Sequence, residues 1–253
     1  WARFFFATIY AVVMCGTKLP AVIKSVAPKK QLLRSVLLMS TTGVFNAGIR
    51  TTPLATGTTI MFLSPILVTL LSIPLLGEKV GIRRWAGIVM GFIGAIIVVQ
   101  PWKGGLQGVG VGILFLLVAA LFNANYQIVT RMVRDDDPLT SLLFTAAAGA
   151  IVTSCLVPWF WQWPSGTGWG LLIASGIAGG LGHFCLIRAL RLAPASVVAP
   201  FSYSSLIWAA LFGFIIWNDW PDFWTWVGAA IIIGSGLYIF HREHSRNVTA
   251  VET

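Results

Sequence analysis

The stretch from Pro53 to Val99 reads PLATGTTIMFLSPILVTLLSIPLLGEKVGIRRWAGIVMGFIGAIIVV. It contains two apolar runs, 55–76 and 84–100, joined by a short segment that carries Glu78 and Lys79. A helix rises about 1.5 Å per residue, so each run is long enough to cross the roughly 30 Å of hydrocarbon in a bilayer. The stretch therefore predicts two membrane-spanning helices connected by a charged loop.

The same pattern continues along the whole chain of 253 residues, of which 57% are hydrophobic and 10% are charged. Soluble domains carry about 25% charged residues, so this composition predicts an all-α, polytopic membrane protein. Apolar runs of spanning length occur nine times, and the first is cut short. They cover residues 2–16, 32–49, 55–76, 84–100, 109–130, 138–160, 169–188, 194–217 and 224–240.

The basic residues predict the orientation, because Lys and Arg near helix ends are retained in the cytoplasm. Fourteen of the seventeen lie in alternate loops and in the tail: Lys18, Lys24, Lys29, Lys30, Arg34, Lys79, Arg83, Arg84, Arg131, Arg134, Arg188, Arg191, Arg242 and Arg246. The opposite loops are rich in tryptophan, which favours the membrane interface. We therefore expect a multi-pass protein of a bacterial inner membrane with a cytoplasmic C-terminus. The apolar composition makes the lipid bilayer the expected partner. The net charge of +9 does not indicate nucleic acid, because the basic residues lie in short loops between the apolar runs.

An internal repeat appears when the chain is shifted along itself by 141 residues. Pro53 then falls on Pro194, and Arg50 falls on Arg191. Because Arg50 is expected outside and Arg191 inside, the two halves are predicted to be inserted in opposite directions, as in many secondary transporters. We expect a first repeat at 1–100, a second at 108–240 and a cytoplasmic tail at 241–253. The first repeat has one helix fewer than the second, so a tenth helix is expected upstream of Trp1.

The quoted stretch resembles the end of an EamA repeat of the drug/metabolite transporter superfamily. The segment RLAPASVVAPFSYSSLIWAALFGFIIWNDWPDFWTWVGAAIIIGSGLYIF, at 191–240, resembles the corresponding end of the second repeat. The resemblance implies ten helices in two inverted repeats around a central cavity for a small metabolite. Within the superfamily, the sequence most resembles a branch that includes carriers of S-adenosylmethionine and of riboflavin. Asn218-Asp219 replaces the Gly-Glu pair common at this point, and His183 stands where Gln is expected.

Polar side chains within apolar runs are the candidates for contact with a substrate, because hydrocarbon penalises them unless they face a cavity or another helix. Aromatic neighbours suit a partly planar organic compound. The alternative role of each residue is packing or hydrogen bonding between helices. The predicted substrate-binding residues are His183, Asn123, Phe201, Tyr203, Ser204, Asn46, Ser64, Tyr126 and Gln127. Pro200 lacks an amide hydrogen and is expected to open a bend beside them.

No enzyme motif, cofactor-binding motif or metal-ligand cluster is found in the sequence, so we expect neither an enzyme nor a cofactor. The glycines of two helices, at 87–94 and 176–182, are interpreted as close helix contacts. The acidic run Asp135 to Asp137 is interpreted as a solvated helix start. The predicted function is a secondary transporter that works by alternating access. A channel or scaffold subunit is the alternative, and the sequence leaves a homodimer open.

Overall fold

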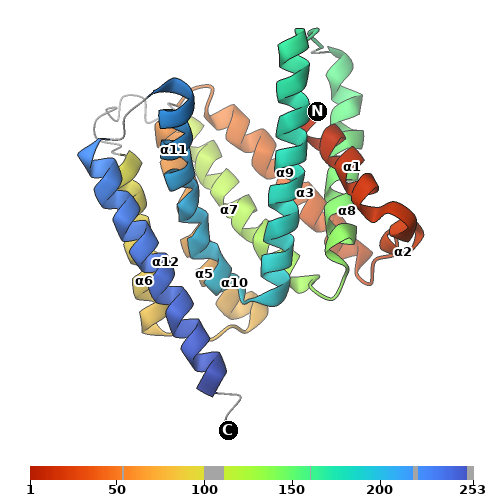
Figure 1. Ribbon diagram of the computed structural model, residues 1–253. Helices are drawn as coiled ribbons and strands as arrows, with labels where there is room; N and C mark the ends of the chain where they lie inside the picture. The colour runs from red at the N-terminus through yellow and green to blue at the C-terminus, as the bar shows by residue number, and fades with distance from the viewer. Residues whose placement is uncertain (53, 100–110, 160, 219–221, 250–253) are drawn as a thin grey trace. The chain divides into compact units, whose positions relative to one another are not determined.

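The structure, a computed structural model, describes all residues except 53, 100–110, 160, 219–221 and 250–253. The described residues form helices and no strands, which confirms the predicted all-α class (Figure 1). The helices are α1 (Ala2–Cys15), α2 (Leu19–Val22), α3 (Pro28–Gly48), α4 (Leu54–Met61), α5 (Ser64–Leu76), α6 (Ile82–Val99), α7 (Val111–Met132), α8 (Pro138–Leu156), α9 (Gly166–Leu192), α10 (Ala195–Val198), α11 (Ser205–Trp217) and α12 (Phe223–Thr249), with 3₁₀ helices η1 (Gly16–Lys18), η2 (Val157–Trp159) and η3 (Ala199–Ser204).

Each of the nine predicted runs coincides with a helix or with a broken helix. Among the described residues, four helical stretches are long and apolar enough to cross a bilayer by themselves, and α5 and the apolar part of α12 are shorter. Helix α12 continues past the predicted end of the last run at 240 and ends at Thr249. The four long stretches are Ala2–Val22, Val111–Met132, Pro138–Trp159 and Gly166–Leu192.

The run at 55–76 forms two helices instead of one. Helix α4 ends at Met61 and α5 begins at Ser64. Pro65 lies in the first turn of α5 and has no amide hydrogen to donate to the carbonyl of Met61, so the helical hydrogen bond that would join α4 to α5 at this point is absent. The break leaves backbone groups available at membrane depth, where they need partners from elsewhere in the protein.

The run at 194–217 is broken at the corresponding place. Helix α10 is followed by η3, which contains Pro200, and α11 begins at Ser205. The bend expected at Pro200 is therefore present. Ser205 lies 141 residues after Ser64, so the second helix piece begins at the same position in both repeats.

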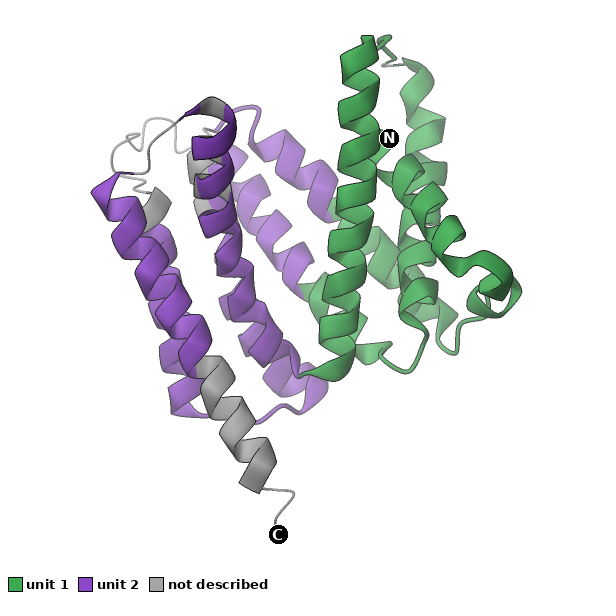
Figure 2. Ribbon diagram, viewed as in Figure 1, with its two compact units in different colours: residues 1–40, 125–193 green, residues 41–124, 194–253 purple. Residues whose placement is uncertain are grey.

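The chain divides into two compact units, coloured green and purple in Figure 2. Unit 1 contains residues 1–40 and 125–193, and unit 2 contains residues 41–124 and 194–253. Each unit therefore takes helices from both halves of the sequence. Helices α1, α8 and α9 lie in unit 1, and α4 to α6 and α10 to α12 lie in unit 2.

Helices α6 and α12 pack closely in unit 2. A Cβ atom on Gly91 would lie 3.2 Å from Ser235 Oγ, and one on Gly94 would lie 2.9 Å from Ile232 Cγ1. The later residue of α6 meets the earlier residue of α12, so the two helices are antiparallel. In the repeat, Gly91 is equivalent to Ile232 and Gly94 is equivalent to Ser235, because each pair is 141 residues apart. The contact of Gly91 with Ser235 is therefore the symmetry equivalent of the contact of Gly94 with Ile232. An antiparallel pair of equivalent helices is what an inverted repeat requires.

Helix α1 packs against α8 and α9 in unit 1 at glycine positions. A Cβ atom on Gly149 of α8 would overlap the Phe4 ring, and one on Gly176 of α9 would overlap Phe6 Cβ. Small residues allow such close approach between helices in a membrane. The interpretation of the glycines as packing positions is confirmed at Gly176, whereas a Cβ atom on Gly182 would meet nothing within 4 Å.

The ends of α5 and α11 share an unusual backbone conformation. Gly77 follows α5 with φ +67°, and Asn218 follows α11 with φ 58°. These residues are equivalent in the two repeats. Glycine adopts this left-handed region freely, and asparagine is among the few other residues that tolerate it. The replacement of glycine by Asn218 thus preserves the helix end.

The start of α10 is held by a side chain from the connection between α5 and α6. The carboxylate of Glu78 accepts hydrogen bonds from the backbone amides of Ala195 at 2.7 Å and Ser196 at 3.1 Å. Arg84 donates to Ser196 Oγ at 2.7 Å. These contacts attach the broken helix of the second repeat to the first repeat within unit 2.

Candidate functional site

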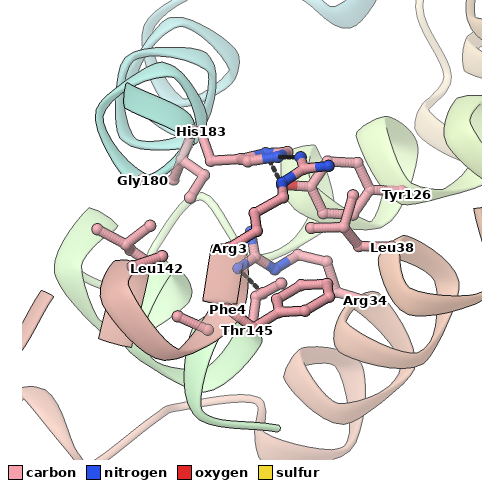
Figure 3. A pocket seen from close by; sticks show the side chains of 13 residues that line it. Arg3, Phe4, Arg34, Leu38, Tyr126, Leu142, Thr145, Gly180 and His183 are labelled. Atoms are coloured by element: carbon pink, nitrogen blue, oxygen red, sulfur yellow. Dashed lines mark hydrogen bonds between the residues drawn. The ribbon is translucent and has the colours of Figure 1, made fainter. Parts of the chain in front are cut away.

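The candidate site in unit 1 centres on His183, which α9 carries. Its Nε2 lies 2.8 Å from Nη2 of Arg3, on α1, and its Nδ1 lies 3.1 Å from the hydroxyl of Tyr126, on α7. The rings of Tyr126 and His183 meet edge to face with centroids 5.8 Å apart. Figure 3 shows the three side chains converging at one side of a pocket. Because Arg3 can only donate, Nε2 of His183 is the acceptor in that bond.

Arg34, on α3, forms another wall of the same pocket. Its side chain is fully buried, and its guanidinium carbon lies 5.4 Å from the centre of the Tyr126 ring. Nη2 donates to the backbone carbonyl of Ser141 and to the hydroxyl of Thr145, both on α8. Within the described part of the chain, Nε and Nη1 of Arg34 have no hydrogen-bond partner. Arg34 is expected among the loop cations, whereas the structure places it within α3 with its side chain buried against α8.

The remaining walls of the pocket are apolar or small. They are Phe4, Ala7, Leu38, Leu142, Ala146, Gly179, Gly180 and Ile187, together with Thr145. The lining thus combines two guanidinium groups, one imidazole and one phenol with an apolar surround, and it includes no carboxylate. Binding sites for organic molecules typically combine an apolar surface with a few polar groups, and the lining has this composition.

Gln127, the third predicted residue of unit 1, does not line this pocket. It is buried, and its Oε1 atom has no partner among the described residues. The structure thus brings His183 and Tyr126 together and leaves Gln127 apart from them.

The other six predicted residues belong to unit 2. Asn123 donates to Ser64 Oγ at 3.0 Å, and Ser64 donates to the carbonyl of Ala120 at 2.9 Å. Ser64 is the first residue of α5, so this chain of bonds ties the break between α4 and α5 to α7. Asn46 donates to the carbonyl of Thr42 in its own helix.

Tyr203 is the buried member of the predicted group in η3. Its hydroxyl donates to the carbonyl of Phe62 at 3.2 Å, and the two rings lie 5.8 Å apart. Phe62 is the residue at the break between α4 and α5, where its carbonyl needs a partner. By contrast, Phe201 is exposed, and Ser204 donates to the carbonyl of Phe201 in its own turn.

The connection between α7 and α8 carries a buried acid outside the membrane-spanning segments. Asp136 accepts hydrogen bonds from Ser25 Oγ at 2.6 Å, from the Val26 amide at 2.7 Å and from Gln31 Nε2 at 2.8 Å. Burial alone would raise the pKa of Asp136, but these bonds and the charge of Arg34 lower it below the ordinary value of 3.8. The acidic run is therefore not wholly solvated.

The next acid in this run has the role that the sequence suggested. Asp137 caps α8 by accepting from the Leu139 amide at 2.8 Å. A carboxylate at the N-cap satisfies a helix amide that has no partner within the helix. The expectation of a helix start is thus confirmed for Asp137.

The residues predicted from the sequence do not include Arg3 or Arg34. A signal for both is present in the sequence, since Arg3 falls within the predicted run 2–16 and Arg34 within 32–49. An ionisable residue inside a membrane segment suggests a functional site by default. The signal is masked because each residue lies near the end of its run, where cations are common, and Arg34 also belongs to the set that predicts the orientation.

Comparisons with known proteins agree on one family. The sequence profile of the EamA-like transporter family matches residues 1–100 and 110–240. An S-adenosylmethionine uptake transporter of Rickettsia felis is 29% identical over 242 residues, which cover 95% of this chain and 81% of the relative. A riboflavin transporter of Vibrio cholerae is 32% identical over 197 residues, which cover 77% of this chain and 65% of the relative. A solved crystal structure that is 19% identical matches the fold with a TM-score of 0.81 over 94% of this chain and 84% of the other.

Proposed function

Because the chain belongs to the EamA-like transporter family, we propose that it carries a small organic metabolite of the amino acid, nucleoside or vitamin type across a bacterial inner membrane. The protein is a multi-pass membrane transporter, and its relatives are named for S-adenosylmethionine and for riboflavin. Both compounds combine a planar ring system with polar groups. The aromatic ring of Tyr126 beside His183 suits such a compound.

The observation that supports alternating access most directly is the contact between Tyr203 and Phe62. These residues lie 141 positions apart and occupy the breaks of two equivalent helices. In transporters of inverted repeats, broken helices typically form the substrate site near the bilayer midplane, and one repeat moves against the other around that site. The antiparallel pair of α6 and α12 supplies the equivalent halves that such a mechanism needs.

The assignment of sides and repeats follows from the sequence. We propose a cytoplasmic C-terminus, because most basic residues then lie on the cytoplasmic side. The proposed repeats are 1–100 and 108–240, followed by a tail at 241–253. Within unit 1, His183 and Tyr126 are the predicted residues whose geometry supports contact with the substrate.

Transport by the full-length protein in proteoliposomes tests the proposal. We expect saturable uptake of labelled S-adenosylmethionine or riboflavin, and accelerated release when unlabelled compound is added to the opposite side. Liposomes without protein are the control. Flux that rises linearly with concentration and shows no exchange would instead indicate a channel, and no flux of any tested metabolite would refute the proposed substrate class.

Substitutions at two predicted residues test the site. We expect His183→Ala and Asn123→Ala each to lower uptake. Ser175→Ala is the control and should change uptake little, because Ser175 is not a predicted site residue and donates to the carbonyl of Leu172 in its own helix. Unchanged kinetics in both test variants would remove these residues from the pathway while leaving the transporter fold intact.

A further inference from the structure

Arg34 carries hydrogen-bonding capacity that the protein itself leaves unused. The residue is fully buried, and Nη2 has two partners on α8. Nε and Nη1 have none among the described residues, although both are shielded from solvent. A buried donor without a partner is costly, and the cost is higher for a charged group. Arg34 lines the pocket, so a molecule bound there can reach it (Figure 3).

The charges around the pocket are also unbalanced. Arg3 and Arg34 both line it, and no carboxylate is among the lining residues. The nearby carboxylate of Asp136 interacts electrostatically with Arg34, but it does not line the pocket, and its oxygens accept hydrogen bonds from Ser25, Val26 and Gln31. Cations inside membrane proteins normally pair with an anion or with backbone carbonyls. The lining therefore places two guanidinium groups beside a tyrosine ring and a histidine without a carboxylate of its own.

We propose that this pocket binds the carboxylate of the transported metabolite, with Arg34 and Arg3 supplying the opposite charge. This inference rests on the proposed function and narrows it to substrates that carry an anionic group. The planar guanidinium matches a carboxylate in shape and charge, and such bonds are about twice as strong as neutral ones. The ring of Tyr126, held between Arg34 and His183, provides an aromatic surface next to the carboxylate.

The first test uses the unchanged protein and two ligands that differ only in the carboxylate. Full-length protein in phosphatidylcholine nanodiscs, which carry no net lipid charge, is titrated with S-adenosylmethionine and with its decarboxylated analogue. We expect the compound with the carboxylate to bind about 10- to 100-fold more tightly, as for the loss of one charge-assisted hydrogen-bonding group. Equal affinities, or binding of riboflavin but of neither adenosyl compound, would overturn the inference while leaving the transporter function in place.

The second test connects the preference to Arg34. Arg34→Met should lower the affinity for S-adenosylmethionine to that of the decarboxylated compound and should leave the affinity for the latter unchanged. Arg34→Lys, which keeps the charge but has fewer donors, should give an intermediate value. Arg188→Met is the matched control, because Arg188 is exposed on α9 and does not line the pocket. A loss of affinity for both ligands in equal measure would assign Arg34 a structural role only.

Three further outcomes separate this inference from its alternatives. If anionic lipid, added to the nanodiscs, abolishes the preference of the unchanged protein, a lipid headgroup is the natural anion and the inference is wrong. If Arg34→Met does not fold, the two-ligand comparison on the unchanged protein still decides the question. If no compound binds and none is transported, the proposed substrate class fails, and the inference fails with it.

Discussion

The buried carboxylate of Asp136 is expected to stabilise unit 1 through the three donors that converge on it. Ser25 and Val26 belong to the connection before α3, and Gln31 lies in its first turns. Asp136→Ala removes the acceptor of all three bonds. Asp135 is adjacent but exposed, so Asp135→Ala is a control that changes the net charge equally.

The expected loss follows from the burial of the three donors. A hydrogen bond to a charged group contributes about 1.5 to 3 kcal/mol. The Val26 residue is exposed and Ser25 is half-buried, so water can replace the carboxylate there at little cost, whereas Gln31 is fully buried. We therefore expect the free energy of unfolding to fall by about 3 kcal/mol, which is close to the contribution of one hydrogen bond to a charged group and well below the sum for three. For a chain of this length that is a decrease in Tm of about 6 to 12 °C.

The pH dependence of this effect follows from the lowered pKa of Asp136. A carboxyl group with a lowered pKa in the folded state stabilises it fully above the unfolded-state pKa. The stabilisation is lost as pH falls through the lower, folded-state value. The difference in Tm between the unchanged protein and Asp136→Ala should therefore be constant from about pH 7 to about pH 5 and should shrink below about pH 4.

Tryptophan fluorescence during heating in detergent micelles measures these shifts, and circular dichroism confirms that the helices are lost. The reasoning would be refuted if Asp136→Ala and Asp135→Ala had equal Tm values at pH 7. It would also be refuted if the difference grew on acidification, because the folded-state pKa of Asp136 would then be raised.

Two further predictions concern glycine positions. Asn218→Gly should raise Tm slightly and Gly77→Ala should lower it, each by about 1 kcal/mol or less in unfolding free energy, because both positions have φ near +60°; a gain in Tm from Gly77→Ala would contradict this. Gly176→Ala should destabilise the protein and Gly182→Ala should not, because only the substitution at Gly176 places a Cβ atom against α1. The same measurement of Tm checks both variants. An unchanged Tm in Gly176→Ala would exclude the close contact.

The fold is predictable because its signals are local or periodic. Each of the nine predicted apolar runs coincides with a helix or a broken helix of the described residues, and the proline at 200 indicates the bend that η3 provides. The repeat offset is visible in a few special positions. What the sequence does not indicate is that the run at 55–76 is broken as well, since Pro65 alone is compatible with a kinked but continuous helix.

The site is less predictable, because the direction of a side chain depends on which helices surround it. Arg34 lies near the start of a membrane segment, where a long side chain can reach back to the interface. Its burial against Ser141 and Thr145 depends on the position of α8, more than 100 residues later in the chain. Similarly, nothing in the acidic run distinguishes Asp136 from its exposed neighbour Asp135 until the connection before α3 lies beside it.

The hydrogen bond from Tyr203 to Phe62 also indicates where the pseudo-two-fold axis of unit 2 lies. Two equivalent residues of an inverted repeat touch only where the pseudo-two-fold axis passes between them, so the axis runs beside these rings. The chain is asymmetric here, since Phe62 has no hydroxyl to return the bond. Tyr203→Phe should therefore cost about 1 kcal/mol by leaving the Phe62 carbonyl without its partner. Adding Phe62→Tyr to that variant should offset part of the loss by a new bond, because the hydroxyl then reaches across the same axis to the carbonyl of residue 203, although the carbonyl of residue 62 stays without its partner. A double variant no more stable than Tyr203→Phe alone, in a double-mutant cycle of Tm values, would place the axis elsewhere.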